Sequence, residues 1–387
     1  MLGITSATAA GVAGAFLAES LIPAQELSSN DAYLSALGEN QNGIELPIQN
    51  FVNFVSLDVK PDITLESVKG WMTVISDDID RMTEGKELLA DTQPQITTMK
   101  SNLTVTVGYG PSLFTKLNIQ DRAPENFKEL PQFKIDKLLP EYSGGDVLLQ
   151  VASNSKIHLE YITRSLIRDS NYFSTVRWTQ SGFSSVDSES PIGSQRNLMG
   201  QIDGTNNPEL NTSSFKNSVW ADSGPDWFRG GTMLVLRRIQ MNLDTWDILE
   251  QDEKEKVIGR KLSNGAPLGG DSELDVVDLS AINNAGVSLI PPFAHIARAH
   301  SGELNALPIF RRPFNYSDGF SKDGKIDAGL LWTAYCKDAY AQYVPIQKSL
   351  EDFDLLNKWT TPVGSALFAI PRGRKSKSEI IGQEIFE

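Results

Sequence analysis

The sequence is poor in the side chains on which many catalytic and metal sites depend. It contains one cysteine, Cys336, and three histidines among 387 residues. A single thiol excludes an intrachain disulfide and a structural zinc site built from cysteines. There is also no HExxH motif and no phosphate-binding loop ending in Gly-Lys-Ser/Thr. Chemistry that needs an imidazole must therefore use His158, His295 or His300.

Positive charge is also scarce. The chain has 35 Lys and Arg against 49 Asp and Glu, a formal net charge of −14. An acidic chain lacks the basic surface that binds nucleic acid or an anionic membrane, so we expect neither as a partner. The one local cluster of cations, formed by Arg372, Arg374, Lys375 and Lys377, is more typical of a solvated surface than of a binding patch.

No lysine or arginine precedes Lys60, so the small apolar segment 2–24 lacks the basic region of an export signal. The segment is also too short and too rich in alanine and glycine for a stable membrane span. Two explanations stay open: an ordinary N-terminal helix, or the end of a twin-arginine leader whose basic start lies upstream. The second predicts export to the periplasm or cell surface, with residues 1–43 as leader remnant and linker.

The rest of the composition is globular, with 40% hydrophobic and 22% charged residues, and the length predicts two domains. In the first half, β-branched runs predict strands and three-four spacing of apolar residues predicts helices. Strands are expected at 51–59, 103–108, 145–153 and 173–179, and helices at 65–82 and 157–168. The order β-α-β-β-α-β is that of a ferredoxin-like domain.

The second half repeats this order loosely. Strands are expected at 231–241, 329–336 and 364–370, and helices at 246–260 and 338–350. Between them, residues 262–328 form a long insertion that contains His295 and His300, and long irregular segments tend to carry function. We therefore predict an α+β protein of two ferredoxin-like domains, at residues 44–190 and 191–387.

Two segments are candidates for the chemistry. The first is GQIDGTNNP (200–208), which is either a tight turn or a place where glycines let the backbone approach a flat ligand and present Asp203. The second is residues 291–316. Its histidines are five residues apart and share a helical face poorly, which disfavours a two-histidine metal site. Arg311 and Arg312 are either a surface pair or cations directed at a ligand.

These segments resemble the dye-decolourising peroxidases, haem proteins built of two ferredoxin-like domains. The resemblance runs from about Gly43 to the C-terminus and is strongest with the exported, iron-uptake branch called deferrochelatase/peroxidase. Its stretches include LTVTVGYGPSLF (103–114), RNLMGQIDGTNNP (196–208), IGRKLSNGAPLG (258–269), AHIARAH (294–300) and FRRPFNY (310–316). It implies a peroxidase that binds one haem b per chain and oxidises small organic reductants with hydrogen peroxide.

The resemblance also implies roles for individual residues. His295 matches the axial ligand of the haem iron, Asp203 the distal acid and Arg311 the distal arginine. Asp338 matches, less closely, the acid that hydrogen-bonds the axial histidine. The positions expected to contact haem are Gly204, Thr205, Asn206, His295, His300, Ser301, Gly302 and Arg311.

The chain departs from the family pattern at three positions. Ala297 stands where the family has arginine, with Arg298 one place later, and this leaves open whether a partner of the haem propionates has moved. His300 replaces a common asparagine and Gln201 a common basic residue. The sequence also leaves open whether the native role is peroxidation or removal of iron from haem, and whether iron-uptake partners or a homo-oligomer are involved.

Overall fold

The computed structural model describes residues 31–186, 190, 193–300, 307–321 and 324–387. The strands are β1 (Phe51–Val59), β2 (Thr104–Tyr109), β3 (Val147–Ser153), β4 (Ser174–Phe183), β5 (Gln195–Arg196), β6 (Ile202–Asp203), β7 (Thr232–Met241), β8 (Phe310–Arg311), β9 (Phe314–Phe320), β10 (Ile326–Cys336) and β11 (Thr360–Ile370). The α-helices are α1 (Leu65–Thr83), α2 (Pro94–Thr97), α3 (Pro111–Lys116), α4 (Lys156–Ser170), α5 (Ser213–Val219), α6 (Leu243–Asp247), α7 (Gln251–Ile258), α8 (His295–Ala299) and α9 (Ala339–Phe353).

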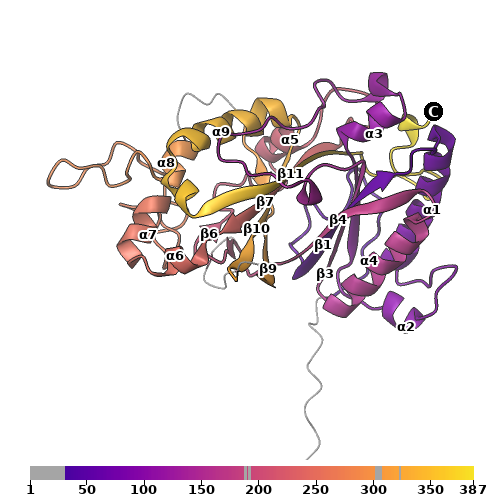
Figure 1. The fold of residues 1–387 in the computed structure, drawn as a ribbon, viewed down its shortest axis with the longest axis horizontal. Coiled ribbons are helices and arrows are strands. Elements are labelled where there is room, and N and C mark those ends of the chain that lie inside the picture. Colours follow the sequence, from indigo (N-terminus) through magenta and orange to yellow (C-terminus); the bar gives the residue numbers. More distant parts are fainter. Residues whose placement is uncertain (1–30, 187–189, 191–192, 301–306, 322–323) are drawn as a thin grey trace, which may run out of the picture.

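The long strands form two sheets that join into one antiparallel barrel (Figure 1). In the first half the sheet order is β2-β3-β1-β4, and in the second it is β9-β10-β7-β11, which is the same relation between chain order and sheet order. The halves meet at two narrow seams, where Phe183 of β4 pairs with Asn315 of β9 and Ala369 of β11 pairs with Tyr109 of β2. The predicted α+β fold of two ferredoxin-like units is confirmed.

Buried apolar side chains alternate between the two faces of the strands, so the core of the barrel has two layers. On β1, Val52 and Phe54 belong to the apolar cluster inside the barrel, whereas Val55 and Leu57 belong to the cluster between the sheet and the helices. Successive side chains of a strand point to opposite faces, so one strand supplies both clusters.

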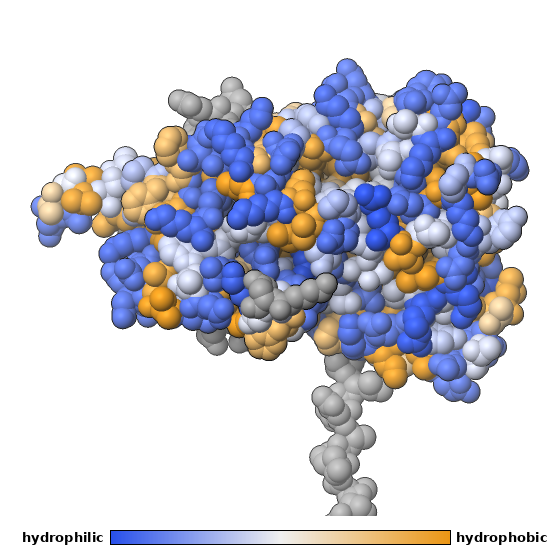
Figure 2. Space-filling model, viewed as in Figure 1, coloured by the Kyte–Doolittle hydropathy of each residue, from blue (hydrophilic) through white to orange (hydrophobic). Residues whose placement is uncertain are grey.

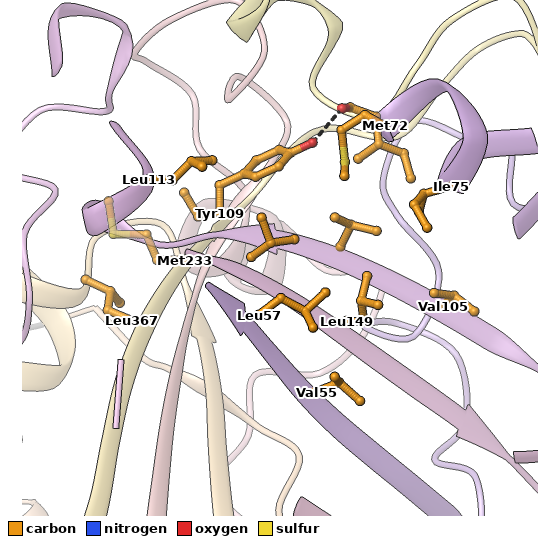
Figure 3. Close-up of a cluster of buried hydrophobic side chains, with 14 of the residues drawn as sticks. Val55, Leu57, Met72, Ile75, Val105, Tyr109, Leu113, Leu149, Met233 and Leu367 are labelled. Carbon is orange, nitrogen blue, oxygen red and sulfur yellow. Dashed lines mark hydrogen bonds between the residues drawn. The ribbon is translucent and has the colours of Figure 1, made fainter. Parts of the chain in front are cut away.

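The outer cluster crosses the junction between the halves. Figure 3 shows Met233 and Leu367 of the second half close to Tyr109 and Leu113 of the first. The Tyr109 hydroxyl donates to the carbonyl oxygen of Ile381 at 2.8 Å, so the C-terminal segment is anchored to β2. The two halves therefore share one packed layer.

The second half differs from the sequence prediction in two elements. The expected helix 246–260 is divided into α6 and α7, because Glu250 begins a new helix with a capping box to Glu253. The segment expected to be an insertion contains β8 and β9, and β9 is the second strand of the repeated unit. The insertion proper is the segment between α7 and α8, which extends from the body in Figure 1.

Three of the four C-terminal cations, Arg372, Arg374 and Lys377, form ion pairs. Arg374 is 3% exposed and pairs with Asp80, while Arg372 pairs with Glu379 and Glu384. On the face shown in Figure 2, apolar residues are interspersed with hydrophilic ones. Within the described part of the chain, every helix is too short or too polar to cross a membrane.

Candidate active site

The two halves differ in how their helices cover the sheet. In the first half, α1 and α4 pack directly on the strands. In the second half, a cavity of about 450 Å³ is lined by residues of β7, β10 and α9, together with residues of α8 and of the β5–β6 hairpin. This volume is typical of small-molecule and cofactor sites, which combine an apolar wall with a few polar groups.

His295 begins the short helix α8 and lines the cavity. Its Nδ1 donates to Oδ2 of Asp354 at 2.6 Å. Burial acts to lower the pKa of His295, but the charge and hydrogen bond of Asp354 outweigh it, so the pKa lies above its usual value. With Nδ1 engaged, Nε2 is the nitrogen left to bind a ligand, and the ring is fixed in one orientation.

Backbone contacts bring this histidine and its carboxylate together. Asp354 caps the C-terminus of α9, and its Oδ1 accepts from the backbone N–H of Leu356. The N–H of Leu355 donates to the carbonyl oxygen of Phe293, two residues before His295. The neighbouring side chain of Arg298 donates to the carbonyl oxygen of Ser349, which attaches α8 to α9.

The structure corrects the prediction that Asp338 hydrogen-bonds His295. Asp338 lies at the opposite end of α9, where its carboxylate accepts from the backbone N–H groups of Tyr340 and Ala341 as the N-cap. Ser, Thr, Asp and Asn are the usual N-cap residues, so Asp338 has a sufficient structural role there. The helix separates this carboxylate from the one that contacts His295.

Asp203 and Arg311 form the second polar group of the cavity. Asp203 Oδ1 lies 3.0 Å from Arg311 Nη1, and both residues line the cavity. Gly200 and Gly204 have φ of +82° and +104°, a region that glycine enters at little cost, so the turn interpretation of this motif is correct. The turn also brings Asp203 to the cavity wall, so the two interpretations do not exclude each other.

Asn207 fixes the turn to β8. Its side-chain amide donates to the carbonyl oxygen of Arg311 at 2.8 Å, and its carbonyl oxygen accepts from the backbone N–H of Arg311 at 3.0 Å. Strand β8 is in turn paired with Ala334 and Tyr335 of β10. The main chain on both sides of the Asp203–Arg311 pair is therefore held by hydrogen bonds.

His300 and Arg260 are among the further basic groups that line the cavity. His300 Nδ1 donates to the carbonyl oxygen of Ile296, and its pKa is lowered by burial and by the charges of Arg260, Arg311 and His295. Arg260 is 7% exposed, and burial and the charge of Arg311 lower its pKa. Among the described residues Arg260 has hydrogen bonds but no ion pair, so this part of the cavity is suited to an anionic group.

Most of the predicted site residues meet in this one cavity, while their roles stay predictions. Those that line it are Asp203, Gly204, Thr205, Asn206, His295, His300 and Arg311. Ser301 and Gly302 lie outside the described residues. Sequence reasoning missed Asp354, Arg260 and Asn207, because each is brought to the site by contacts distant in sequence.

Comparison with known proteins covers most of the chain. Residues 41–184 match the N-terminal part of the Dyp-type peroxidase family, and residues 194–375 match its C-terminal part. A dye-decolorizing peroxidase from Thermobifida fusca is 36% identical over 90% of this chain and 84% of its own length. A deferrochelatase from Escherichia coli K12 is 27% identical over 90% of this chain and 86% of its own length.

Solved structures agree with these matches. A DyP-type peroxidase from Cellulomonas bogoriensis superposes with a TM-score of 0.87 and 40% identity, over 92% of this chain and 99% of that one. Ferric DtpA from Streptomyces lividans has the same TM-score with 31% identity, over 92% of this chain and 97% of that one. The fold, the paired domains and the sequence identity lead to one conclusion: this chain belongs to the Dyp-type peroxidase family.

Proposed function

We propose that this chain is a haem-dependent peroxidase that reduces hydrogen peroxide and oxidises a broad range of organic reductants, including dyes, phenols and porphyrins. The observation that carries the proposal is the convergence of the His295–Asp354 and Asp203–Arg311 pairs on one cavity. A hydrogen-bonded imidazole is a usual axial ligand of haem iron, and an acid with an arginine suits peroxide cleavage.

The residues present fit one haem b per chain. Of the two imidazoles that line the cavity, that of His295 has one nitrogen engaged by a carboxylate, an arrangement that suits a ligand of haem iron. Gln201 lines the cavity, is 4% exposed, and its Nε2 has no hydrogen-bond partner among the described residues. A buried amide without a partner is costly, so it favours a polar group of a bound ligand at this wall. Arg260 and His300 add basic groups suited to the haem propionates.

Each residue has a definite task in this proposal. A bound haem would supply the redox chemistry, giving electrons to the peroxide and regaining them from the organic reductants. Asp354 orients His295, which would bind the iron through Nε2. Asp203 takes a proton from one peroxide oxygen and returns it to the other, because a positioned carboxyl can act as base and then as acid. Arg311 holds a fixed positive charge beside the departing oxygen.

The proposal is tested by the visible spectrum of the purified protein reconstituted with haem. We expect a Soret band that changes when hydrogen peroxide is added. The variant His295→Ala should lose tight haem binding, whereas His158→Ala should keep it, because His158 is buried between Ser101 and the carbonyl oxygen of Thr97 in the first half. Equal Soret absorbance in wild type and His295→Ala would disprove the assignment.

A second candidate is release of iron from haem, which the deferrochelatases among the relatives suggest. It uses the same cavity but needs no peroxide. Iron-free porphyrin that accumulates after haem addition, with peroxide excluded, would favour this role over peroxidation.

We also propose that the protein is exported by the twin-arginine route, to the periplasm or the cell surface, after it has folded around haem. The apolar composition of residues 2–24, which lie outside the described residues, supports this. Mapping the genomic start and fractionating cells tests it. A start at Met1 together with purely cytoplasmic protein would refute it.

A further inference from the structure

Glu273 is a buried acid that the proposed mechanism does not use. It belongs to the segment between α7 and α8 that extends from the body in Figure 1, yet Glu273 itself is only 2% exposed. Its Oε1 accepts from the hydroxyls of Ser194 at 2.6 Å and Thr205 at 2.8 Å, and its Oε2 accepts from the hydroxyl of Ser190 at 2.8 Å. Among the described residues it forms no ion pair, so hydroxyl groups are its main stabilising partners.

Two of these hydroxyls lie at the open end of the hairpin that carries Asp203, that of Ser194 just before β5 and that of Thr205 just after β6. Ser194 directly precedes Gln195, which pairs with Asp203 across the β5–β6 ladder. Thr205 follows Asp203 by two residues in the same turn. One carboxylate oxygen therefore joins the start of the partner strand to the turn that follows Asp203.

We call the two hydrogen bonds from Ser194 and Thr205 to Oε1 of Glu273 the clamp; they restrain a hairpin with a very short ladder. The ladder between β5 and β6 contains only two residue pairs, and a two-stranded ribbon of this length is not stable alone. Asn207 fixes the far end of the turn to Arg311. Hydrogen bonds to an ionised carboxylate are shorter and stronger than neutral ones. Glu273 thus adds a restraint that ties Ser194 to Thr205, beside the bonds that Arg196 donates to the carbonyl oxygens of Gly200 and Leu262.

We propose that Glu273 is a positioning residue that sets the place of Asp203 through Ser194 and Thr205. It also links the extended segment to the cavity, since its backbone carbonyl oxygen accepts from Arg260 Nη1 at 3.1 Å. The proposal rests on the distal role of Asp203 in the proposed function. A residue of the insertion, outside the cavity, thereby controls the geometry of the peroxide-cleaving group.

The first test is Thr205→Val, which keeps the shape of the side chain and removes its hydroxyl. Misplacement of a catalytic group by about 1 Å can cost up to about a hundredfold in rate, so we expect the peroxide-dependent spectral step to slow about tenfold. In Glu273→Gln, whose altered residue lies outside the cavity, Soret absorbance and the later oxidation of a dye by the peroxide-treated enzyme should stay at wild-type values. The matched control is Ser190→Ala, which removes the hydroxyl bound to Oε2 and an acceptor for the backbone N–H of Ser194 but leaves both Oε1 bonds in place. It should react much closer to the wild-type rate than Thr205→Val does.

The second test separates positioning from a merely structural role. Glu273→Ala removes the acceptor, whereas Glu273→Gln keeps one acceptor oxygen for Ser194 and Thr205. We expect the alanine variant to be slow and the glutamine variant to recover most of the rate. A glutamine variant as slow as a folded alanine variant would overturn the proposal, and so would a Thr205→Val variant with the wild-type rate.

Hydrogen exchange measured by mass spectrometry distinguishes failure of this inference from failure of the proposed function. Peptides covering residues 196–208 should exchange faster in Glu273→Ala and Thr205→Val than in Ser190→Ala, in protein with or without haem. If the wild type showed no reaction with peroxide, the proposed function would fail, but this comparison would still test the clamp. Equal exchange in all variants would overturn the clamp alone.

Discussion

Asp203 and Arg311 should be needed to cleave peroxide but not to hold haem. Their side chains pair with each other at 3.0 Å, while His295 is held separately by Asp354. We expect Asp203→Asn and Arg311→Leu to keep a Soret band and to slow the first peroxide-dependent step. Loss of a general acid–base group costs about 10²–10⁴ in rate, and loss of one charge-stabilising donor about 10²–10³.

Stopped-flow mixing with peroxide from acidic to neutral pH measures both effects. Asp203→Asn preserves the shape of the turn and removes only the group that accepts and returns the proton, so the rate should fall at every pH tested. If this variant reacted as fast as wild type at every pH, Asp203 would not be the acid–base group, and Arg311 with water would carry the step.

Arg260 should recognise the carboxylates of haem. The family arginine is replaced by Ala297, and the adjacent Arg298 donates to Ser349 and lies over the ring of Phe353, so it does not compensate. Arg260 lines the cavity instead. A charged hydrogen bond is worth about 1.5–3 kcal/mol, so Arg260→Leu should weaken binding of haem about tenfold to a hundredfold more than binding of haem dimethyl ester.

Fluorescence-quenching titrations with the two porphyrins give this ratio, and Arg298→Leu is the matched control that should leave it unchanged. Because the ester lacks free carboxylates, a general disturbance of the loop would weaken both ligands equally. An unchanged ratio in Arg260→Leu would place the propionates elsewhere.

Single residues also show where sequence reasoning reaches its limit. His295, Asp203 and Arg311 could be identified because each lies in a local motif. Asp354 could not, because it is 59 residues from His295 and reaches it only through the docking of α8 on α9. The family resemblance predicts Asp338 for this role, but a carboxylate at that position accepts from the free backbone N–H groups in the first turn of α9.

At the scale of helices, α1 and α4 bring like charges together. Asp78 of α1 is 7% exposed, and burial together with the charges of Asp169 and Asp77 raises its pKa to about 7. The folded state therefore binds this proton more tightly than the unfolded state, and stability falls as pH rises from about 4 to about 7. We expect Asp78→Asn to stabilise the protein by on the order of 2 kcal/mol at about pH 8, with an effect that disappears near pH 4.

Urea denaturation of the wild type and the variant across this pH range is the measurement. Asp169→Asn removes one of the like charges and should give a smaller stabilisation in the same direction. A gain from Asp78→Asn that is equal at both ends of the range would mean that Asp78 does not titrate in the fold.

The elements predicted best are those whose local signals agree with their packing. Helix α1 follows a Thr64 cap and buries an apolar stripe, and both features are visible in the sequence. The sequence does not predict strand β9, because four of its seven residues are exposed and the polar residues Ser317 and Asp318 and then Gly319 interrupt its apolar pattern. Its place in the sheet is set by pairing with β10, which sequence periodicity does not reveal.

At the scale of the whole molecule, two consecutive arginines of β7 connect the halves. Arg237 points outward and pairs with the buried carboxylate of Asp136. Arg238 points inward, where it contacts Gln180 of β4 and lies over the ring of Tyr142, both from the first half. Because the strand seams are each one residue pair long, these contacts and the shared apolar core hold the barrel closed.

The two halves should therefore unfold together, and Arg238 should stabilise both. Arg238 is 1% exposed and also pairs with Asp327 and Asp318, which are partly exposed. Removing one partner of a fully buried ion pair costs about 3–5 kcal/mol, and the access of these carboxylates to water reduces the expected cost of Arg238→Met to about 2–4 kcal/mol.

Hydrogen exchange at increasing denaturant should show peptides of β1 and β7 losing protection at one shared midpoint, which is lower in the variant. Arg229→Met, at an exposed arginine, should change the free energy of unfolding by less than about 0.5 kcal/mol. Protection of β1 that outlasts that of β7 would instead show that the first half folds independently of the second.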